Sequence, residues 1–137
     1  MNKSDLIGFI SKMKTAFISS VDGHGYPVTR AMLAPRRIEN DVFYFTTNTS
    51  SKKVGQFKAN DKACVYFYKR GLFRYRGVCL IGRMEICANR SAKEAVWRPG
   101  DKIFYKKGVT DPDYCVLKFK CNYAEYYCDF KTEAVAF

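Results

Sequence analysis

The sequence predicts a mainly β fold, an antiparallel β-barrel with short helices, built by residues 1–137 as a single domain. Phe and Tyr, which favour strands, number 11 and 10, beside one Trp. Apolar runs of strand length alternate with turn-rich segments at hairpin spacing, and only three short stretches have helical periodicity. A doubly wound parallel sheet would need a helix between most of its strands, so an antiparallel barrel is favoured.

The first half of the chain predicts two helices and four strands. Ser4 is suited to cap a first helix, because the apolar residues after it follow helical spacing. Turns rich in Gly, Asp, Asn and Pro are expected at 22–27 and 38–41. The strands are expected at 15–21, 28–36, 42–46 and 62–69, with a bend at Pro35 and a short helix at 51–59 before the last of them.

The second half predicts a long strand, one helix and two closing strands. The strand at 74–86 is interrupted by Gly77 and Gly82, which predict bulges or bends. Ser91 to Glu94 matches a capping box and begins a helix that carries Trp97, and Pro99-Gly100 ends this helix. A loop at 103–113 and strands at 114–120 and 124–130 complete the barrel.

The run Val42-Phe-Tyr-Phe-Thr-Thr-Asn-Thr-Ser-Ser-Lys-Lys53 is the most informative segment for function. A predicted strand ends in hydroxyl and amide residues and meets two lysines where a helix begins, with Ser50 or Ser51 as its N-cap. Lysines oppose the helix dipole at this position. Free N–H groups, hydroxyls and ammonium groups at a helix start suit a phosphate. A solvated lysine pair on a surface helix is the alternative.

The charge and hydropathy of the sequence limit the classes of partner that the protein is expected to bind. The net charge of +11 suggests anionic ligands, but Lys and Arg are scattered in ones and twos, so a dedicated nucleic-acid-binding role is a minor alternative. Arg74 and Arg76 flank Tyr75 and suit either a ligand phosphate or a solvent-exposed face. No apolar stretch approaches the ~18 residues of a membrane span, and no signal peptide is recognisable. We expect a cytoplasmic protein without a membrane partner.

The cysteine pattern gives little support for a metal site. Six cysteines lie at 64, 79, 87, 115, 121 and 128, without a Cys-x-x-Cys pair, and His24 is the single histidine. Most of these cysteines fall inside apolar strand-like runs, where a free thiol behaves as a small buried hydrophobe. We therefore expect reduced thiols and no metal ligands.

In this order and spacing, the motifs resemble the pyridoxamine 5′-phosphate oxidase-like family of FMN-binding split barrels, in particular its general-stress-protein branch. The first motif is Ala16-Phe-Ile-Ser-Ser-Val-Asp-Gly-His-Gly-Tyr-Pro-Val-Thr-Arg-Ala-Met32, and the second is the run at 42–53 followed by Phe57 and Asn60. A third, weaker match begins at Asp111-Pro112-Asp113-Tyr114 and continues to about residue 127.

The resemblance implies FMN bound at a homodimer interface, and it implies roles for single residues. Arg30, Ser51, Lys52 and Lys53 would hold the FMN phosphate. Thr46 and Thr47 would approach the ribityl chain or the ring, and the main chain around Met32 would border the isoalloxazine. Trp97 would either stack near the flavin from the second subunit or serve ordinary packing. No general acid or base is evident, so catalytic residues stay unassigned.

The sequence differs from the family's oxidases at positions that concern the substrate and not the fold. The chain has Pro35 where those enzymes carry a basic residue, and it lacks their closing arginine-bearing segment, so oxidation of pyridoxamine phosphate itself is not expected. A flavin-dependent oxidoreductase is the leading hypothesis. The alternatives are a flavin or haem binder or sensor without turnover, a deazaflavin in place of FMN, and a basic nucleic-acid-binding barrel.

Overall fold

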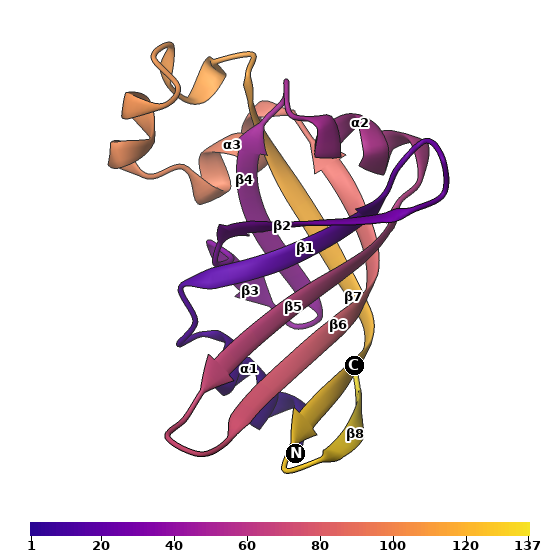
Figure 1. Ribbon diagram of the computed structural model, residues 1–137. Helices are drawn as coiled ribbons and strands as arrows, with labels where there is room; N and C mark the ends of the chain where they lie inside the picture. The colour runs from indigo at the N-terminus through magenta and orange to yellow at the C-terminus, as the bar shows by residue number, and fades with distance from the viewer.

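The computed structural model describes residues 1–137 and shows one strongly curved antiparallel sheet (Figure 1). Its strands are β1 Thr15–Val21, β2 Pro27–Leu33, β3 Arg37–Glu39, β4 Val42–Asn48, β5 Lys62–Arg70, β6 Tyr75–Cys87, β7 Tyr114–Cys128 and β8 Lys131–Ala136. They follow the order β2-β1-β5-β6-β7-β4-β3, and β8 pairs with the last part of β7. Since β2 and β3 do not pair, the barrel is split between them. The predicted fold class is confirmed.

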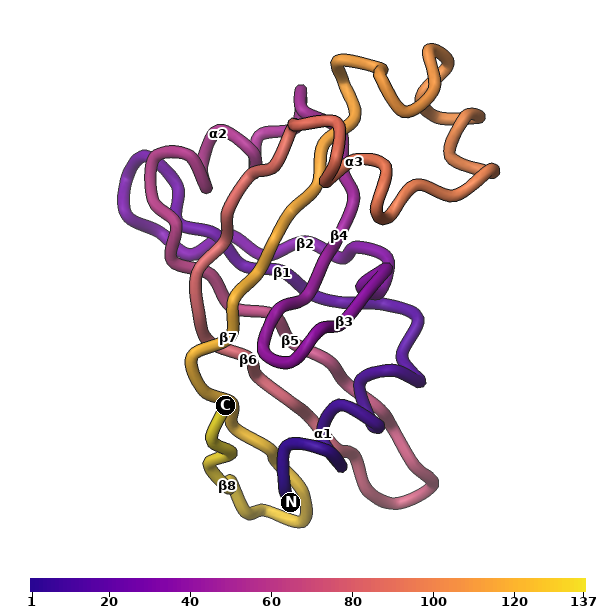
Figure 2. The backbone as a smooth tube through the Cα atoms, turned by 180° about the vertical axis from the view of Figure 1, so that it is seen from behind, coloured from indigo at the N-terminus to yellow at the C-terminus, as the bar shows by residue number.

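Three short helices and two 3₁₀ turns complete the chain: α1 Lys3–Ile10, α2 Lys52–Ala59, α3 Arg90–Val96, η1 Pro99–Ile103 and η2 Gly108–Thr110. The helices α1 and α2 lie at opposite ends of the barrel, as both Figure 1 and Figure 2 show. The segment from α3 through η2 extends away from the barrel at the α2 end. No helix is long and apolar enough to cross a membrane.

The core fills the barrel because alternate strand residues point inward. In β4, for example, Phe43, Phe45 and Thr47 are buried, whereas their neighbours are partly exposed. Nineteen buried apolar residues form one cluster, to which α1 contributes Leu6 and α2 contributes Phe57. A three-residue cluster around Tyr114 lies beneath the extended segment.

Glycine occupies two positions within β6, Gly77 and Gly82, for different structural reasons. A side chain at Gly82 would clash with the backbone of Lys120, and the register with β7 shifts there because Asn122 is an extra residue. This is the predicted bulge. Gly77 lies in regular pairing. A Cβ there would lie 2.1 Å from the Tyr66 hydroxyl, so a larger residue would have to displace the Tyr66 side chain. Because the register does not shift at Gly77, a bulge, one of the two predicted alternatives, is wrong there.

Several predicted boundaries need correction. The first helix is capped by Asn2, whose side chain accepts from Asp5 N, and α3 is capped by Asn89, whose side chain accepts from Ala92 N. Side-chain geometry decides between neighbouring polar residues, so Ser4 and Ser91 are not the caps. The expected loop at 103–113 contains η2, and the expected closing pair of strands is a single bulged strand, β7. The strand β8 was not predicted.

Candidate anion site at the start of α2

The start of α2 combines unsatisfied donors with a buried hydroxyl. Ser51 is the N-cap by its backbone conformation, but its side chain makes no capping hydrogen bond. Its Oγ is buried without any partner, as is Oγ1 of Thr49. The first N–H groups of a helix also have no partner inside the helix. Since buried polar groups are almost always satisfied, this end of α2 has the properties of a site for an external acceptor.

Arg30 reaches toward this helix from the inner face of β2. Its Nη1 donates to Ser20 Oγ at 2.8 Å and to the Ile18 carbonyl at 3.2 Å, and its Nη2 donates to Gln56 Oε1 at 3.2 Å. These neutral acceptors orient the guanidinium without neutralising it. Burial lowers the pKa of Arg30, which shows that its charge is poorly compensated.

Lys53 lies close to Arg30 and shares its environment. Its side chain is half-buried, and its pKa is lowered first by desolvation and then by the positive charge of Arg30. Lys52, the neighbouring residue, is exposed. None of the ion pairs of the molecule includes Arg30, Lys52 or Lys53. Two neighbouring cations held without a carboxylate make this region a candidate anion site.

The two predicted threonines lie on opposite faces of β4. Thr47 points into the barrel and is buried, and it is paired with Cys115 of β7, a residue close enough to Lys53 to feel its charge. Thr46 is partly exposed on the other face, on the same side as Tyr44. The structure therefore places Thr47 inside the barrel beside Cys115 and Thr46 on the outer face of the same strand.

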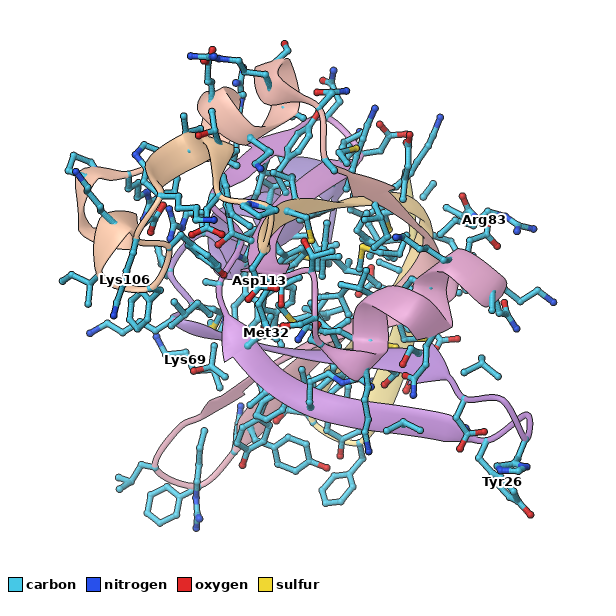
Figure 3. The ribbon with its side chains drawn as sticks, turned by 90° about the horizontal axis from the view of Figure 1, so that it is seen from above. Tyr26, Met32, Lys69, Arg83, Lys106 and Asp113 are labelled. Atoms are coloured by element: carbon cyan, nitrogen blue, oxygen red, sulfur yellow. The ribbon has the colours of Figure 1, made fainter.

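Met32 and Trp97 lie at different borders of this region. Met32 is half-buried against the main core on β2, two residues beyond Arg30 and on the same face. Figure 3 shows it near one end of β2, while Tyr26 points into solvent beyond the other end. Trp97 packs edge-on against Tyr114 with ring centroids 5.0 Å apart, and also near Tyr105. Within one chain, Trp97 belongs to the small cluster and not to the cation site.

Two residues that sequence reasoning missed complete the site. Ser20 Oγ donates to Gln56 Oε1 at 2.5 Å, and both groups contact Arg30. The sequence contains a feature that could have indicated each of these two residues. Ser20 is a polar residue on the inward face of β1, and Gln56 lies three positions after Lys53 and thus on the same side of α2.

The segment after α3 is fixed by buried polar contacts. Arg36 donates to both carboxylate oxygens of Asp101, at 2.6 and 2.8 Å, and to the Val96 carbonyl at 3.1 Å. Lys93 Nζ donates to the Asp111 carbonyl at 2.8 Å, and the Tyr114 hydroxyl donates to the Lys93 carbonyl at 2.9 Å. These contacts hold Trp97 in place although its surroundings contain little regular structure.

The residues of this candidate site can bind an anion and stabilise its negative charge. No group of three or more His, Cys, Asp or Glu residues could hold a metal ion. All six cysteines are free, and two of them, Cys115 and Cys121, are buried. No carboxylate pair or base–nucleophile pair lies among the residues around Arg30.

Comparisons with known proteins agree with this architecture. A family model for "Pyridoxamine 5'-phosphate oxidase like" proteins matches residues 2–137. A solved structure from Clostridium acetobutylicum, of a protein related to general stress protein 26 of B. subtilis, is 30% identical with a TM-score of 0.84, over 98% of this chain and 93% of that one. General stress protein 26 from Bacillus anthracis is 21% identical with a TM-score of 0.79, over 98% of each chain.

More distant structures share the fold alone. A haem-binding protein from Mycobacterium smegmatis superposes with a TM-score of 0.71 at 9% identity, over 92% of this chain and 54% of that one. No curated protein sequence is significantly similar to this chain. Since the family model matches almost every residue, including the motifs at 16–32 and 42–53, this chain belongs to the pyridoxamine 5′-phosphate oxidase-like family.

Proposed function

We propose that this protein binds FMN and acts in flavin-dependent redox chemistry, with the FMN phosphate at the start of α2. The observation that carries the proposal is the buried, unpartnered Ser51 hydroxyl at the N-cap of α2, two residues before Lys53, together with the absence of a carboxylate partner for Lys53 and for Arg30, which contacts α2 at Gln56. A phosphate dianion would satisfy the hydroxyl, the free N–H groups and both charges together.

The residues present fit this group. Arg30 is held by Ile18, Ser20 and Gln56 in a fixed orientation, and these bonds leave two of its five N–H donors, one on Nε and one on Nη2, for phosphate oxygens. Lys52 and Lys53 supply point charges from the first turn of α2. The unfavourable placement of lysines in this turn is explained if an anion binds there, because the anion reverses the sign of the local field.

The remaining predicted residues would border the rest of the cofactor. Thr47 is buried inside the barrel on β4, and Met32 lies on the same inner face of β2 as Arg30. The split between β2 and β3 leaves the outer edge of β2 without a hydrogen-bonded neighbour. When bound, the flavin supplies the electron and hydride transfer, while the protein binds and orients it. We leave catalytic residues unassigned.

We further propose that the protein is a homodimer with its flavin sites at the interface. Leu33, next to Met32, is 74% exposed, and Phe17 and Tyr68 are exposed on the strands beside it. Exposed apolar side chains on one face of a sheet are typical of a subunit contact. This outer face is opposite to the one that carries Arg30 and Met32, so a second chain would exclude water from the flavin ring only by packing also along the unpaired edge of β2, and its Trp97 would then be the candidate for stacking. Light scattering of the purified protein tests this assembly.

The decisive experiment is the visible spectrum of protein purified without added cofactor, followed by mass analysis of the molecule released on denaturation. We expect a flavin spectrum and the mass of FMN. A Soret band would instead indicate haem, whose iron needs an axial ligand such as His; the one histidine, His24, lies exposed in the β1–β2 turn. A deazaflavin would be recognised by its mass.

A thermal-shift titration separates phosphate recognition from ring binding. FMN should stabilise the protein by about 2.7 kcal/mol at a hundred times its Kd, whereas riboflavin, which lacks the phosphate, should stabilise it much less. Equal effects of both ligands would contradict the phosphate site, and a colourless protein that neither ligand stabilises would refute the function. Reduction of bound flavin by NADH or NADPH, with reoxidation by an acceptor, would distinguish an oxidoreductase from a binder.

A further inference from the structure

Two hairpin turns expose large apolar side chains at the end of the molecule opposite α2. The turn between β5 and β6 carries Leu72 and Phe73, which are 86% and 92% exposed, and the turn between β7 and β8 carries Phe130, which is 95% exposed. Figures 1 and 2 both show these turns at the end of the barrel where the chain also begins. We call Leu72, Phe73 and Phe130 the apolar tip.

The two turns form one surface. Arg74 Nη1 donates to Asp129 Oδ2 at 3.2 Å, which ties one turn to the other. Behind them, the rings of Tyr75 and Tyr127 stack with centroids 4.9 Å apart. Phe73 and Phe130 line one shallow hollow together with these four residues. Phe73 and Phe130 therefore belong to one patch, and Leu72 precedes Phe73 in the same turn.

Phe130 occupies a position that its own turn does not favour. Asp129 and Phe130 have φ values of 51° and 64°, and they form the two-residue connection between Cys128 and Lys131. Such turns prefer Asn and Gly because most other side chains are strained in this conformation. A phenylalanine that is both strained and exposed gains nothing from folding, so its role lies outside the isolated chain.

Positive charge surrounds the apolar tip. The segments 69–76 and 128–131 contain five cations and one carboxylate, Asp129, which Arg74 already occupies. A hollow of about 240 Å³ beside the tip is lined mainly by Lys69, Arg70, Arg74 and Arg76. Projecting apolar side chains above a ring of cations complement a flat, negatively charged surface with an apolar interior.

We propose that the apolar tip anchors this protein reversibly to an anionic lipid bilayer. Leu72, Phe73 and Phe130 insert among the lipids while the exposed Lys69, Arg70 and Lys131 face the headgroups. The excess of like charge disfavours a second copy of the same tip as the occupant. The sequence excluded a membrane partner because no segment spans a bilayer, but surface anchoring needs no spanning segment. The anion site at α2 lies at the far end and stays accessible.

The test is co-sedimentation of the full chain with phosphatidylcholine vesicles that contain or lack phosphatidylglycerol. We expect binding to the anionic vesicles only, weakened at about 0.5 M salt because headgroup charges are then screened. The variant L72S/F73S/F130S should bind at least about tenfold more weakly. Tyr26→Ser, at an exposed hairpin turn without flanking cations, is the matched control and should bind like the wild type.

Two single variants distinguish insertion from a structural defect. Phe130→Asn relieves the left-handed strain, so thermal stability should hold or rise while vesicle binding falls. Phe73→Trp should show a blue-shifted, stronger emission when anionic vesicles are added. The proposal is overturned if the triple variant binds like wild type, if wild type binds neither vesicle, or if the triple variant instead changes the oligomeric state, which would make the tip a subunit contact.

Discussion

Arg30 and Arg36 are both partly buried, but their surroundings differ in one respect. Arg36 faces the Asp101 carboxylate, which raises its pKa through two hydrogen bonds. Arg30 faces only neutral acceptors, and burial lowers its pKa. The fold supplies the counter-charge where the arginine fixes a loop, and leaves it out where an external anion is expected. The opposite directions of the two pKa shifts thus reflect the presence of a carboxylate beside Arg36 and its absence beside Arg30.

The largest effect is expected from Asp101→Ala. The side chains of Arg36 and Asp101 are 12% and 8% exposed, so the variant leaves a buried guanidinium without its partner. Removing one member of a buried pair typically costs about 3–5 kcal/mol. Urea unfolding should show a loss of that order. The matched control is Asp61→Ala, which breaks the exposed Arg83 pair and should cost less than about 1 kcal/mol.

The Arg36–Asp101 pair also predicts that the protein loses part of its folding stability in acid. Hydrogen bonds from Arg36 lower the pKa of Asp101 below its ordinary value of 3.8. A depressed carboxylate pKa stabilises the fold fully above 3.8, and this contribution is lost as the pH falls through the lower folded-state value. Asp101→Ala should therefore unfold with a shallower dependence on pH in this range. An unchanged acid transition would show that other carboxylates dominate it.

Arg30→Met should produce the opposite result from Asp101→Ala. Its charge is destabilised by burial in the free protein, so the free energy of unfolding should change little or rise. FMN affinity should fall by about 1.5–3 kcal/mol, the value of a hydrogen bond to a charged group. Calorimetric titration measures the affinities of the variant for FMN and for riboflavin. Arg83→Met, at an exposed arginine, is the control and should leave both affinities unchanged.

The pH dependence of FMN binding tests Lys53. Its pKa in the folded chain lies below the ordinary 10.5, since burial and Arg30 disfavour the charged form. In the free protein this charge opposes folding below the folded-state pKa, and the penalty disappears as the pH rises toward 10.5. A bound phosphate favours the charged form, so FMN affinity should fall as the pH rises through the pKa of Lys53. Lys53→Arg should abolish this fall, and a wild-type affinity independent of alkaline pH would exclude Lys53 from the site.

Most of the succession of strands along the chain could be predicted from the sequence because it depends on local signals. The strand β1 has the predicted bounds, Thr15–Val21, and the turn residues from Asp22 to Pro27 locate the β1–β2 hairpin. The strand β8 was missed because its residues are exposed except Val135, so no burial pattern marks it. The single strand β7 was divided in two because Asn122, the bulged residue, resembles a turn in sequence.

The candidate site was predictable where its residues are consecutive and not where the fold assembles them. Ser51, the N-cap, is followed directly by Lys52 and Lys53 in the first turn of α2, so the sequence alone brings these three candidates together. Ser20 and Gln56 meet Arg30 only through the packing of α2 against β1, which no local pattern encodes. Whether a carboxylate neutralises Arg30 is likewise a property of the whole fold.

Ser51→Ala should have the smallest effect, and it compares two helix caps directly. Replacing an N-cap residue by Ala usually costs about 1 kcal/mol of stability. Since Ser51 Oγ makes no hydrogen bond, its removal should leave stability almost unchanged and weaken FMN binding by about 1 kcal/mol, or about fivefold. The matched control is Asn89→Ala, at the N-cap of α3, because the Asn89 side chain accepts a hydrogen bond from Ala92 N at 2.8 Å.

The Asn89→Ala variant should lose about 1 kcal/mol of stability and bind FMN normally. If Ser51→Ala instead destabilised the free protein as Asn89→Ala does, Ser51 would be an ordinary cap and the unpartnered hydroxyl would not mark a ligand site.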